Sequence, residues 1–127
     1  MRRVFAQFVE NMATAPGSGV WIVRSLHHKR RIGIVELSLH KDGQDHEISY
    51  QFLPMFWGKG LATEAIAAVI YHGINEVGLN RIIAETQRAN QRSCQLLLRQ
   101  GFQEIERLDR FGAEQIIFAT TGNNDGD

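Results

Sequence analysis

Cysteine and any clear metal-ligand spacing are what this chain most obviously lacks. Cys94 is the only cysteine among 127 residues, which excludes an internal disulfide and a cysteine-based zinc site. The five histidines offer no ligand spacing either, because His27 and His28 are adjacent while His40 and His46 lie on opposite sides of a turn. We therefore expect no metal, and a reducing cytoplasmic location agrees with the cysteine usage.

An excess of charge and a long apolar run are absent as well. The 14 lysines and arginines balance the 14 aspartates and glutamates, so no overall field recruits nucleic acid or an anionic membrane. Apolar stretches such as Ala65–Tyr71 fall well short of the roughly 20 residues that cross a bilayer. The basic start of the chain meets Gln7 and Glu10 before any sustained apolar region, so no targeting segment is expected.

What is present is the composition of an ordinary globular domain. The chain is 43% hydrophobic and 22% charged, and its length suits one modest core. We expect a single domain over residues 1–120. Residues 121–127 are small and polar with no apolar anchor, which predicts a disordered tail.

The first half of the chain predicts one short helix followed by antiparallel strands. Apolar residues at Val4, Phe5, Phe8, Val9 and Met12 have the spacing of one helical face. Turn residues at 15–19, Asp42-Gly43 and Pro54 then divide the following segment into extended pieces. The expected strands span residues 20–23, 32–40 and 47–52.

The second half predicts two helices alternating with strands. Apolar positions keep a helical period from Ala62 to Gly78, where a left-handed cap is natural. A short strand follows at 81–86, and Asn90 is placed to cap a second helix that ends at Gly101. Two final strands are expected at 102–109 and 115–120. Strand, helix and strand in this order require a crossover between parallel strands, so the fold class is α/β (α+β).

A glycine-containing turn lies between the strand at 47–52 and the first long helix. Its sequence is Trp57-Gly58-Lys59-Gly60-Leu61-Ala62-Thr63-Glu64. Two glycines let backbone amides turn inward, and the first free N–H groups of a helix attract an anion. The turn is therefore a candidate site for a pyrophosphate group.

Gly-x-Gly before a helix has two other interpretations. A tight strand-to-helix turn needs glycine for steric reasons alone. A dinucleotide-binding fold is the second alternative, with Glu85 near the position of a ribose-binding acid, but Thr63 stands where that motif has its third small residue. A Walker loop is excluded because Lys59 is followed by Gly60.

A second cluster of residues narrows the choice. Asn90-Gln91-Arg92-Ser93 is followed by Leu96-Leu97-Leu98-Arg99-Gln100-Gly101-Phe102. Together with Trp57–Ala62, this cluster resembles the signature of the GNAT acetyltransferase superfamily from about Trp21 to Ile117. The sequence is most similar to the branch that acetylates N-terminal amines of ribosomal proteins, which often has tryptophan where the general signature has Gln or Arg.

The resemblance implies a mixed central sheet with a splayed parallel pair of strands and flanking helices. It also implies that the family's N-terminal strand and first helix are missing from this chain. A sheet edge left open in this way invites pairing with another chain, so a homodimer or an exchanged strand is a further expectation.

The resemblance implies acetyl-CoA as the acetyl donor, bound in the splayed gap with its pantetheine arm beside Phe52 and Leu53. The expected pyrophosphate contacts come from the glycine turn and the helix start, and Lys59 or Arg99 meets an outer phosphate, unless each is only a surface charge. The full set of implied cofactor-binding residues is Phe52, Leu53, Trp57, Gly58, Lys59, Gly60, Leu61, Ala62, Thr63, Asn90 and Arg99.

Two residues are the implied catalytic groups. Glu47 is expected to take the proton of the amine, the alternative being a strand-face carboxylate with a cross-strand cation. Many members of the superfamily protonate the thiolate with a tyrosine of the second helix, where this chain has Leu97. Ser93 is the implied substitute, although capping of the helix explains it equally well. A backbone N–H around Leu53 is expected to hold the oxyanion.

Two other reactive side chains are expected to be packing residues. Cys94 falls on the apolar face of its helix, and Tyr50 lies on the apolar face of its strand with Ile48 and Phe52. The implied activity is acetyl transfer to a primary amine, such as a protein N-terminus, a polyamine or an aminoglycoside. The alternatives are a non-catalytic acyl-CoA-binding module and a nucleotide-binding α/β domain.

Overall fold

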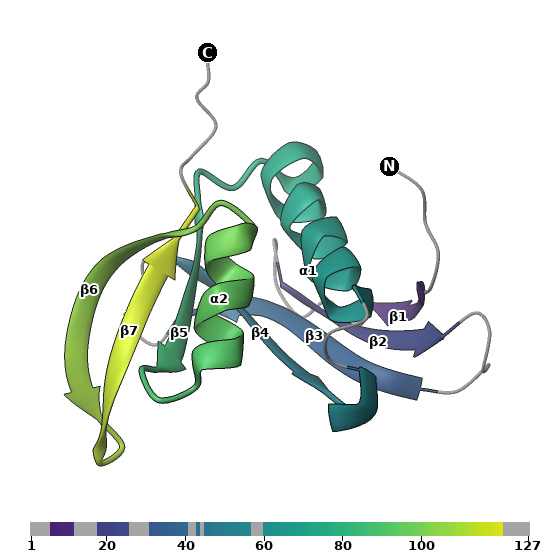
Figure 1. Cartoon of the computed structure of the whole chain (residues 1–127). Coiled ribbons are helices and arrows are strands. Elements are labelled where there is room, and N and C mark those ends of the chain that lie inside the picture. The colour runs from purple at the N-terminus through teal and green to yellow at the C-terminus, as the bar shows by residue number, and fades with distance from the viewer. Residues whose placement is uncertain are drawn as a thin grey trace.

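The computed structural model describes residues 6–11, 18–25, 31–40, 43, 45–56 and 60–120. This part of the chain contains seven strands and two α-helices, with four strands before the first helix and one strand between the helices (Figure 1). In chain order the elements are β1 (Ala6–Asn11), β2 (Gly19–Ser25), β3 (Arg31–Leu39), β4 (His46–Phe52), a 3-10 turn (Pro54–Phe56), α1 (Leu61–Tyr71), a π-helical turn (His72–Val77), β5 (Ile82–Gln87), α2 (Gln91–Arg99), β6 (Gln103–Arg110) and β7 (Ala113–Ala119).

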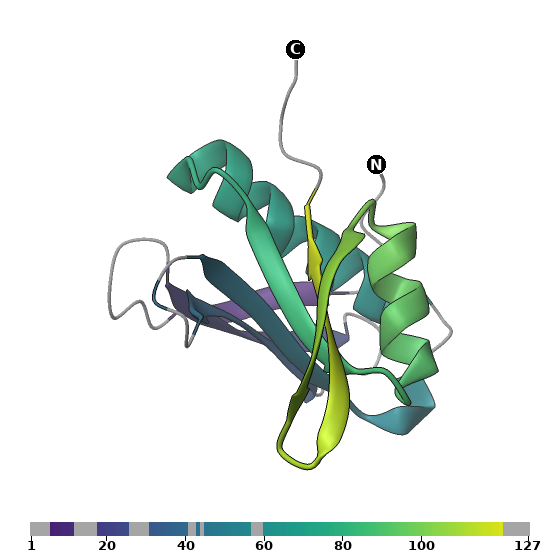
Figure 2. The same ribbon diagram turned by 90° about the vertical axis from the view of Figure 1, so that its left-hand side faces the viewer.

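All the described strands belong to one mixed sheet. Its order is β1-β2-β3-β4-β5-β7-β6, and every neighbouring pair is antiparallel except β4 and β5, which are parallel. Helix α1 makes the crossover that a parallel pair requires. The strong twist of the sheet is clearest in the view turned by 90° (Figure 2).

The parallel pair is joined for a short distance only. The register of β4 and β5 contains His46↔Ile82 and Glu47↔Ile83 and no later pair. By contrast, β4 pairs with β3 along its whole length, from Leu39↔His46 to Gly33↔Phe52. The sheet therefore splits between the later parts of β4 and β5, as the sequence predicted.

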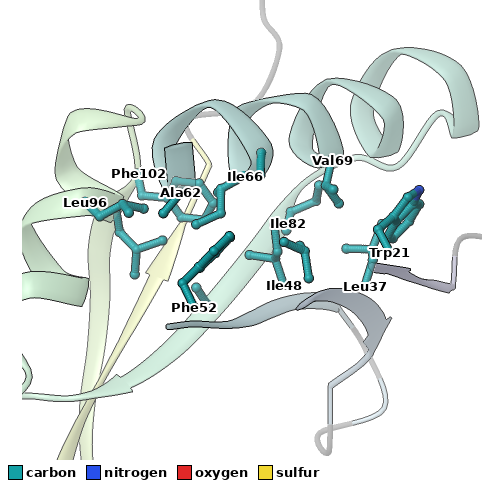
Figure 3. Close-up of a cluster of buried hydrophobic side chains, with 14 of the residues drawn as sticks. Trp21, Leu37, Ile48, Phe52, Ala62, Ile66, Val69, Ile82, Leu96 and Phe102 are labelled. Carbon is teal, nitrogen blue, oxygen red and sulfur yellow. The ribbon is translucent and has the colours of Figure 1, made fainter. Parts of the chain in front are cut away.

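The main core lies between the sheet and the two helices (Figure 3). Helix α1 buries Ala62, Ala65, Ile66 and Val69, the i, i+3, i+4, i+7 spacing of one apolar face. Opposite them the sheet contributes core residues that include Trp21, Leu37, Ile48, Phe52 and Ile82.

Helix boundaries agree with the turn and cap residues of the sequence. Gly78 ends the first helical segment in the left-handed region at φ 89°, and its N–H donates to the Gly73 carbonyl. The last part of that segment widens into a π-helical turn, in which the buried Gly73 lies against Ile82. Asn90 caps α2 with its side-chain oxygen, which accepts from the Ser93 N–H at 3.2 Å.

The prediction of a helix over residues 4–12 was wrong for the described part of that segment. Residues 6–11 form strand β1, which pairs with β2 through Ala6↔Ser25, Gln7↔Arg24 and Phe8↔Val23. A helix this short is marginal in water, whereas pairing gives its backbone a partner along β2. One outer edge of the sheet therefore belongs to β1, and the expected homodimer stays a prediction.

The last two strands meet in a tight hairpin. Phe111 and Gly112 both have positive φ angles, 58° and 74°, and they connect the end pair Arg110↔Ala113. Two successive residues with positive φ match the right-handed twist of a hairpin. Arg110, the last residue of β6, is therefore held next to the turn by its pairing with Ala113.

Two other expectations concern membrane helices and the C-terminal tail. No helix in the described segments is long and apolar enough to span a membrane. The tail at 121–127 lies outside the described residues.

Gly33 supplies the first testable prediction, because it lies directly against the end of β4. A methyl group there would overlap the ring of Phe52 and come within 2.7 Å of the Gln51 carbonyl oxygen. Gly33→Ala should lower the free energy of unfolding by about 1–3 kcal/mol, the usual cost of overpacking. Urea denaturation measures this, with the exposed Ser49→Ala as control, which should change stability by less than about 0.5 kcal/mol. Equal stability of both variants would contradict the described packing.

Candidate active site

A cavity of about 620 Å³ lies where β4 leaves β5. Its volume is in the range of small-molecule sites. It is bounded by the ends of the β2–β4 strands on one side and by Asn90 on the other; its lining residues are Ile22, Arg31, Ile32, Gly33, Ile34, Tyr50, Gln51, Phe52, Leu53, Pro54 and Asn90. The sequence-predicted residues Phe52, Leu53 and Asn90 are thus brought together.

The backbone N–H and C=O groups of successive β4 residues point alternately toward β3 and toward β5. The Leu53 N–H donates to the Ile32 carbonyl oxygen of β3 at 2.9 Å. It therefore does not point to the gap, and the oxyanion donor predicted around Leu53 is not the amide of Leu53 itself. Because successive residues of a strand turn their N–H and C=O to opposite sides, those of Tyr50 and Phe52 face away from β3, toward the gap.

The start of α1 provides the second part of the site. Gly60 is the N-cap residue at φ 80°, a conformation that glycine adopts without strain. Its carbonyl accepts from the Glu64 N–H, which leaves the earlier N–H groups of Leu61, Ala62 and Thr63 at the positive end of the helix dipole. Trp57, Gly58 and Lys59 lie outside the described residues.

A smaller cavity of about 220 Å³ adjoins this helix start, between α1 and α2. It is lined by Gly60, Ala62 and Thr63 and by Arg92, Gln95, Leu96 and Arg99. Two guanidinium groups and a helix N-terminus around one cavity make a site for a phosphate-bearing group. Sequence analysis had predicted Arg99; it missed Arg92, about two helical turns earlier on the same helix.

The two helices are tied together beside this cavity. The Gln100 side chain donates to the Thr63 carbonyl oxygen at 3.0 Å. The first turn of α1 is thereby fixed relative to the end of α2, so that the helix start and the arginines keep their relative positions.

The clearest polar contact of the site joins Tyr50 of β4 to Ser93 of α2. Their hydroxyl oxygens are 2.6 Å apart, and Ser93 is buried. Burial raises the pKa of Tyr50 above its ordinary value of 10.0, although the Ser93 hydrogen bond opposes the change. The phenol is thus a neutral donor at physiological pH.

Sequence analysis placed Tyr50 in the core and missed this contact. The prediction was right about packing, because Tyr50 lies against the main core. Its ring nonetheless reaches from β4 to α2, so that the Tyr50 hydroxyl is in hydrogen-bond contact with the Ser93 hydroxyl. The signal was available in the pattern, since a tyrosine in place of an aliphatic residue needs a partner for its O–H.

Leu97 and Cys94 are packing residues, as predicted. Leu97 is fully buried in the core. Cys94 is half-buried against the same core, and burial, with a smaller contribution from the Glu104 charge, raises the pKa of its thiol above 9.0. A thiol in this state is a poor nucleophile.

Glu47 lies on the other face of the sheet. It alternates with Ile48, which packs under α1, so its side chain points away from the helices. It belongs to the last register pair before the strands separate. Beside it lie His40 and Glu85, two residues that sequence analysis did not connect with Glu47; one ligand atom of each of the three lies within 4.8 Å of the others.

Comparison with known proteins decides the family. The sequence matches the model of the acetyltransferase (GNAT) domain over residues 1–103. The chain belongs to the GNAT acetyltransferase family. A dinucleotide-binding fold is set aside on the same ground, and because the sheet is mixed rather than the mostly parallel sheet that such folds use.

Relatives with a similar sequence or fold carry GNAT names. The N-acetyltransferase YoaA of Bacillus subtilis, which is uncharacterized, is 36% identical over 87 residues; the match takes in 66% of this chain and 48% of that protein. The chain thus spans about half the length of this curated relative.

Two solved structures have the same fold at low identity. A ribosomal-protein-S5-alanine acetyltransferase from Vibrio fischeri superposes with a TM-score of 0.75 at 17% identity, over 84% of this chain and 63% of that one. A mutant spermidine N-acetyltransferase from Vibrio cholerae gives 0.72 at 21% identity, over 84% and 67%. The expected GNAT fold is confirmed.

The raised pKa of Tyr50 gives a prediction for this GNAT domain. The folded state holds the phenolic proton more tightly than the unfolded state, so stability is intact below pH 10 and falls as pH rises through the folded pKa. In a Tyr71→Phe background, where Tyr50 is the only tyrosine, the midpoint of phenolate formation by ultraviolet absorbance should lie above pH 10. Adding Tyr50→Phe should reduce the alkaline loss of stability in urea denaturation. A midpoint at or below pH 10 would contradict the described burial.

Proposed function

We propose that this chain is an acetyl-CoA-dependent N-acetyltransferase that moves the acetyl group onto a primary amine. The single observation that carries the proposal is the split between β4 and β5. Two arginines line a cavity beside the start of α1, the Glu47 carboxylate lies on one face of the sheet, and the Tyr50–Ser93 hydroxyl pair lies on the other.

The described residues suit acetyl-CoA. The cavity with Arg92 and Arg99 beside the start of α1 matches a phosphate-bearing group. The larger cavity along Tyr50, Phe52 and Leu53 suits an extended amide-containing arm, which pairs with an open strand as a further strand would. When bound there, acetyl-CoA supplies a thioester whose acyl carbon accepts the amine.

Glu47 is the proposed proton acceptor. An amine reaches the site as an ammonium ion and attacks only after losing a proton. In this proposal the Glu47 carboxylate takes that proton, and the neutral amine adds to the acyl carbon to form the C–N bond. The tetrahedral adduct then collapses: the C–S bond breaks, the carbonyl re-forms, and the remaining extra proton of the nitrogen passes to water.

The Tyr50–Ser93 pair is the proposed proton donor to the departing sulfur. Its phenol is neutral at physiological pH because burial raises the pKa of Tyr50. Ser93 is in hydrogen-bond contact with that phenol, so a proton given up by either hydroxyl is shared with the other. Ser93 keeps its predicted role, with Tyr50 added, and Asn90 fixes the start of the helix that carries it.

The acceptor is proposed to be a protein N-terminal amine, a polyamine or an aminoglycoside. Two fold relatives act, by their names, on the alanine of ribosomal protein S5 and on spermidine. The face that carries Glu47 also carries Glu36 and Glu85, and carboxylates favour a cationic acceptor.

A thiol-release assay with a panel of these amines tests the proposal. Glu47→Gln should lower kcat by about 10²–10⁴-fold, because the amine loses its base. Acetyl-CoA should still stabilise the variant, by about 2.7 kcal/mol at 100 times its dissociation constant. Glu106→Gln, at an exposed carboxylate on β6, is the control and should keep its rate.

Two results would contradict parts of the proposal. Thermal stabilisation by acetyl-CoA without thiol release for any amine would indicate a non-catalytic acyl-CoA-binding module. Full turnover of Glu47→Gln would remove Glu47 from the mechanism.

A further inference from the structure

Four side chains from four segments meet on the sheet face that carries Glu47. His40 follows β3, Glu47 lies on β4, Glu85 on β5 and Arg110 at the end of β6. The His40 Nε2 atom is 3.0 Å from Glu85 Oε1 and 3.9 Å from Glu47 Oε1. The Arg110 Nε atom is 2.9 Å from the second oxygen of Glu85.

The burial of this group shows which member is fixed and which reaches solvent. The side chains of His40 and Glu85 are 2% and 3% exposed, and that of Glu47 is 17% exposed. A buried carboxylate needs charged or hydrogen-bonding partners, and Glu85 has a guanidinium on one oxygen and an imidazole on the other. Glu85 is therefore the anchored centre, and Glu47 is the outward member.

The contacts also assign the proton of the imidazole. A carboxylate paired with arginine accepts hydrogen bonds, so the proton of His40 lies on Nε2 and is donated to Glu85. The backbone holds the ring at this place, because the His40 N–H donates to Asp45 O and the His40 carbonyl accepts from Gly43 N–H, each at 2.8 Å. An imidazole oriented in this way presents a positive N–H edge between two carboxylates.

We propose that His40 is a positioning residue for Glu47, fixed in turn by Glu85 and Arg110; this inference rests on the proposed function. Two carboxylates this close repel each other. The N–H edge of His40 offsets that repulsion and keeps the Glu47 carboxylate ionised beside the last register pair of β4 and β5. The order Arg110, Glu85, His40, Glu47 places the permanent charge farthest from the substrate and the proton acceptor nearest to it.

A bound metal is the other use of such side chains, and Arg110 argues against it. The guanidinium already contacts Glu85 and brings the positive charge that a cation would bring. Chelation of metals should therefore leave the rate unchanged.

Other charged groups lie near Glu47, and they stay unchanged in the variants used to test His40. Glu36 is on the same face of β3, two residues from Ser38, the cross-strand partner of Glu47. Asp45, which immediately precedes β4, is paired with Arg81 at 2.9 Å. His40, Glu85 and Arg110 are further charged or titratable groups of the same cluster.

A pair of His40 variants tests the role. His40→Leu removes the N–H edge and should lower kcat by about 10–100-fold, the effect of misplacing a reacting group, with the KM for acetyl-CoA unchanged. The acid limb of its pH–rate profile should move to higher pH, because the Glu47 carboxylate loses the positive N–H edge that lies 3.9 Å from it. His40→Gln keeps a donor near the Nε2 position and should restore most of the rate and the original acid limb.

Controls separate this role from folding and from the proposed function. His72→Leu, at a histidine that instead contacts Glu76 and Trp21, should keep the wild-type pH profile, and circular dichroism verifies that each variant folds. If His40→Gln loses as much rate as His40→Leu, or if His40→Leu keeps its rate and profile, the positioning role is refuted. Loss of activity with EDTA, restored by zinc, would overturn it in favour of a metal.

Wild-type turnover is measured first. If no amine of the panel is acetylated, the proposed function itself fails, and the role of His40 fails with it. If the wild type is active and only the His40 results differ from expectation, the function stands and the positioning role alone is refuted. Nitrogen-15 NMR of the histidines tests the contact independently: the preference of His40 for the Nε2–H form should be lost in Glu85→Leu, which removes the acceptor oxygen.

Discussion

The early end of pairing between β4 and β5 is the constraint on which the site depends. Hydrogen bonding between parallel strands would normally continue along both, yet the register stops at Glu47↔Ile83. The other partner of each strand continues: β3 holds β4 to its end, and β7 holds β5. Each half of the sheet thus keeps its own strand pairing on the outer side of the gap, and one core beneath α1 and α2 joins the two halves.

This split gives the site two chemically different faces. On the helix face, Tyr50 meets Ser93, and the start of α1 meets two arginines. On the opposite face, Glu47 meets a buried imidazole and an anchored carboxylate. Strand alternation produces the separation, because Glu47 and Tyr50 are three residues apart on β4 and must point to opposite sides. The proposed proton acceptor and the proposed proton donor are thereby kept on opposite faces of one short strand.

Local chemistry in the sequence predicted the elements around the site well. Asn90 and Gly78 have caps that depend on nearby backbone only, and the period of Ala62, Ile66 and Val69 defines a helix face without reference to other strands. The segment at 4–12 shows the opposite case. Its apolar spacing suits a helix, but residues 6–11 pair with β2. The local sequence pattern gives no information about this pairing, because β2 lies outside the segment.

Contacts between distant residues account for what the sequence did not reveal in the site. Tyr50 and Ser93 are 43 residues apart, and His40 and Glu85 are 45 apart. Each contact depends on the strand register, which sets where β4 stops following β5. Family resemblance led to Glu47 and Ser93 singly. It did not indicate the partners of these two residues, which are His40 for Glu47 and Tyr50 for Ser93. In the sequence, Tyr50 was interpreted as a packing residue, and His40 as a residue next to a turn.

Amide hydrogen exchange with and without coenzyme A tests the central claim most directly. If the split between β4 and β5 binds the cofactor, amides of Tyr50 and Phe52 and of Leu61–Thr63 should gain protection together, while those of the β6–β7 hairpin should not change. Saturable binding that leaves the exchange of β4 and the start of α1 unaltered, or protects only other segments, would contradict the account.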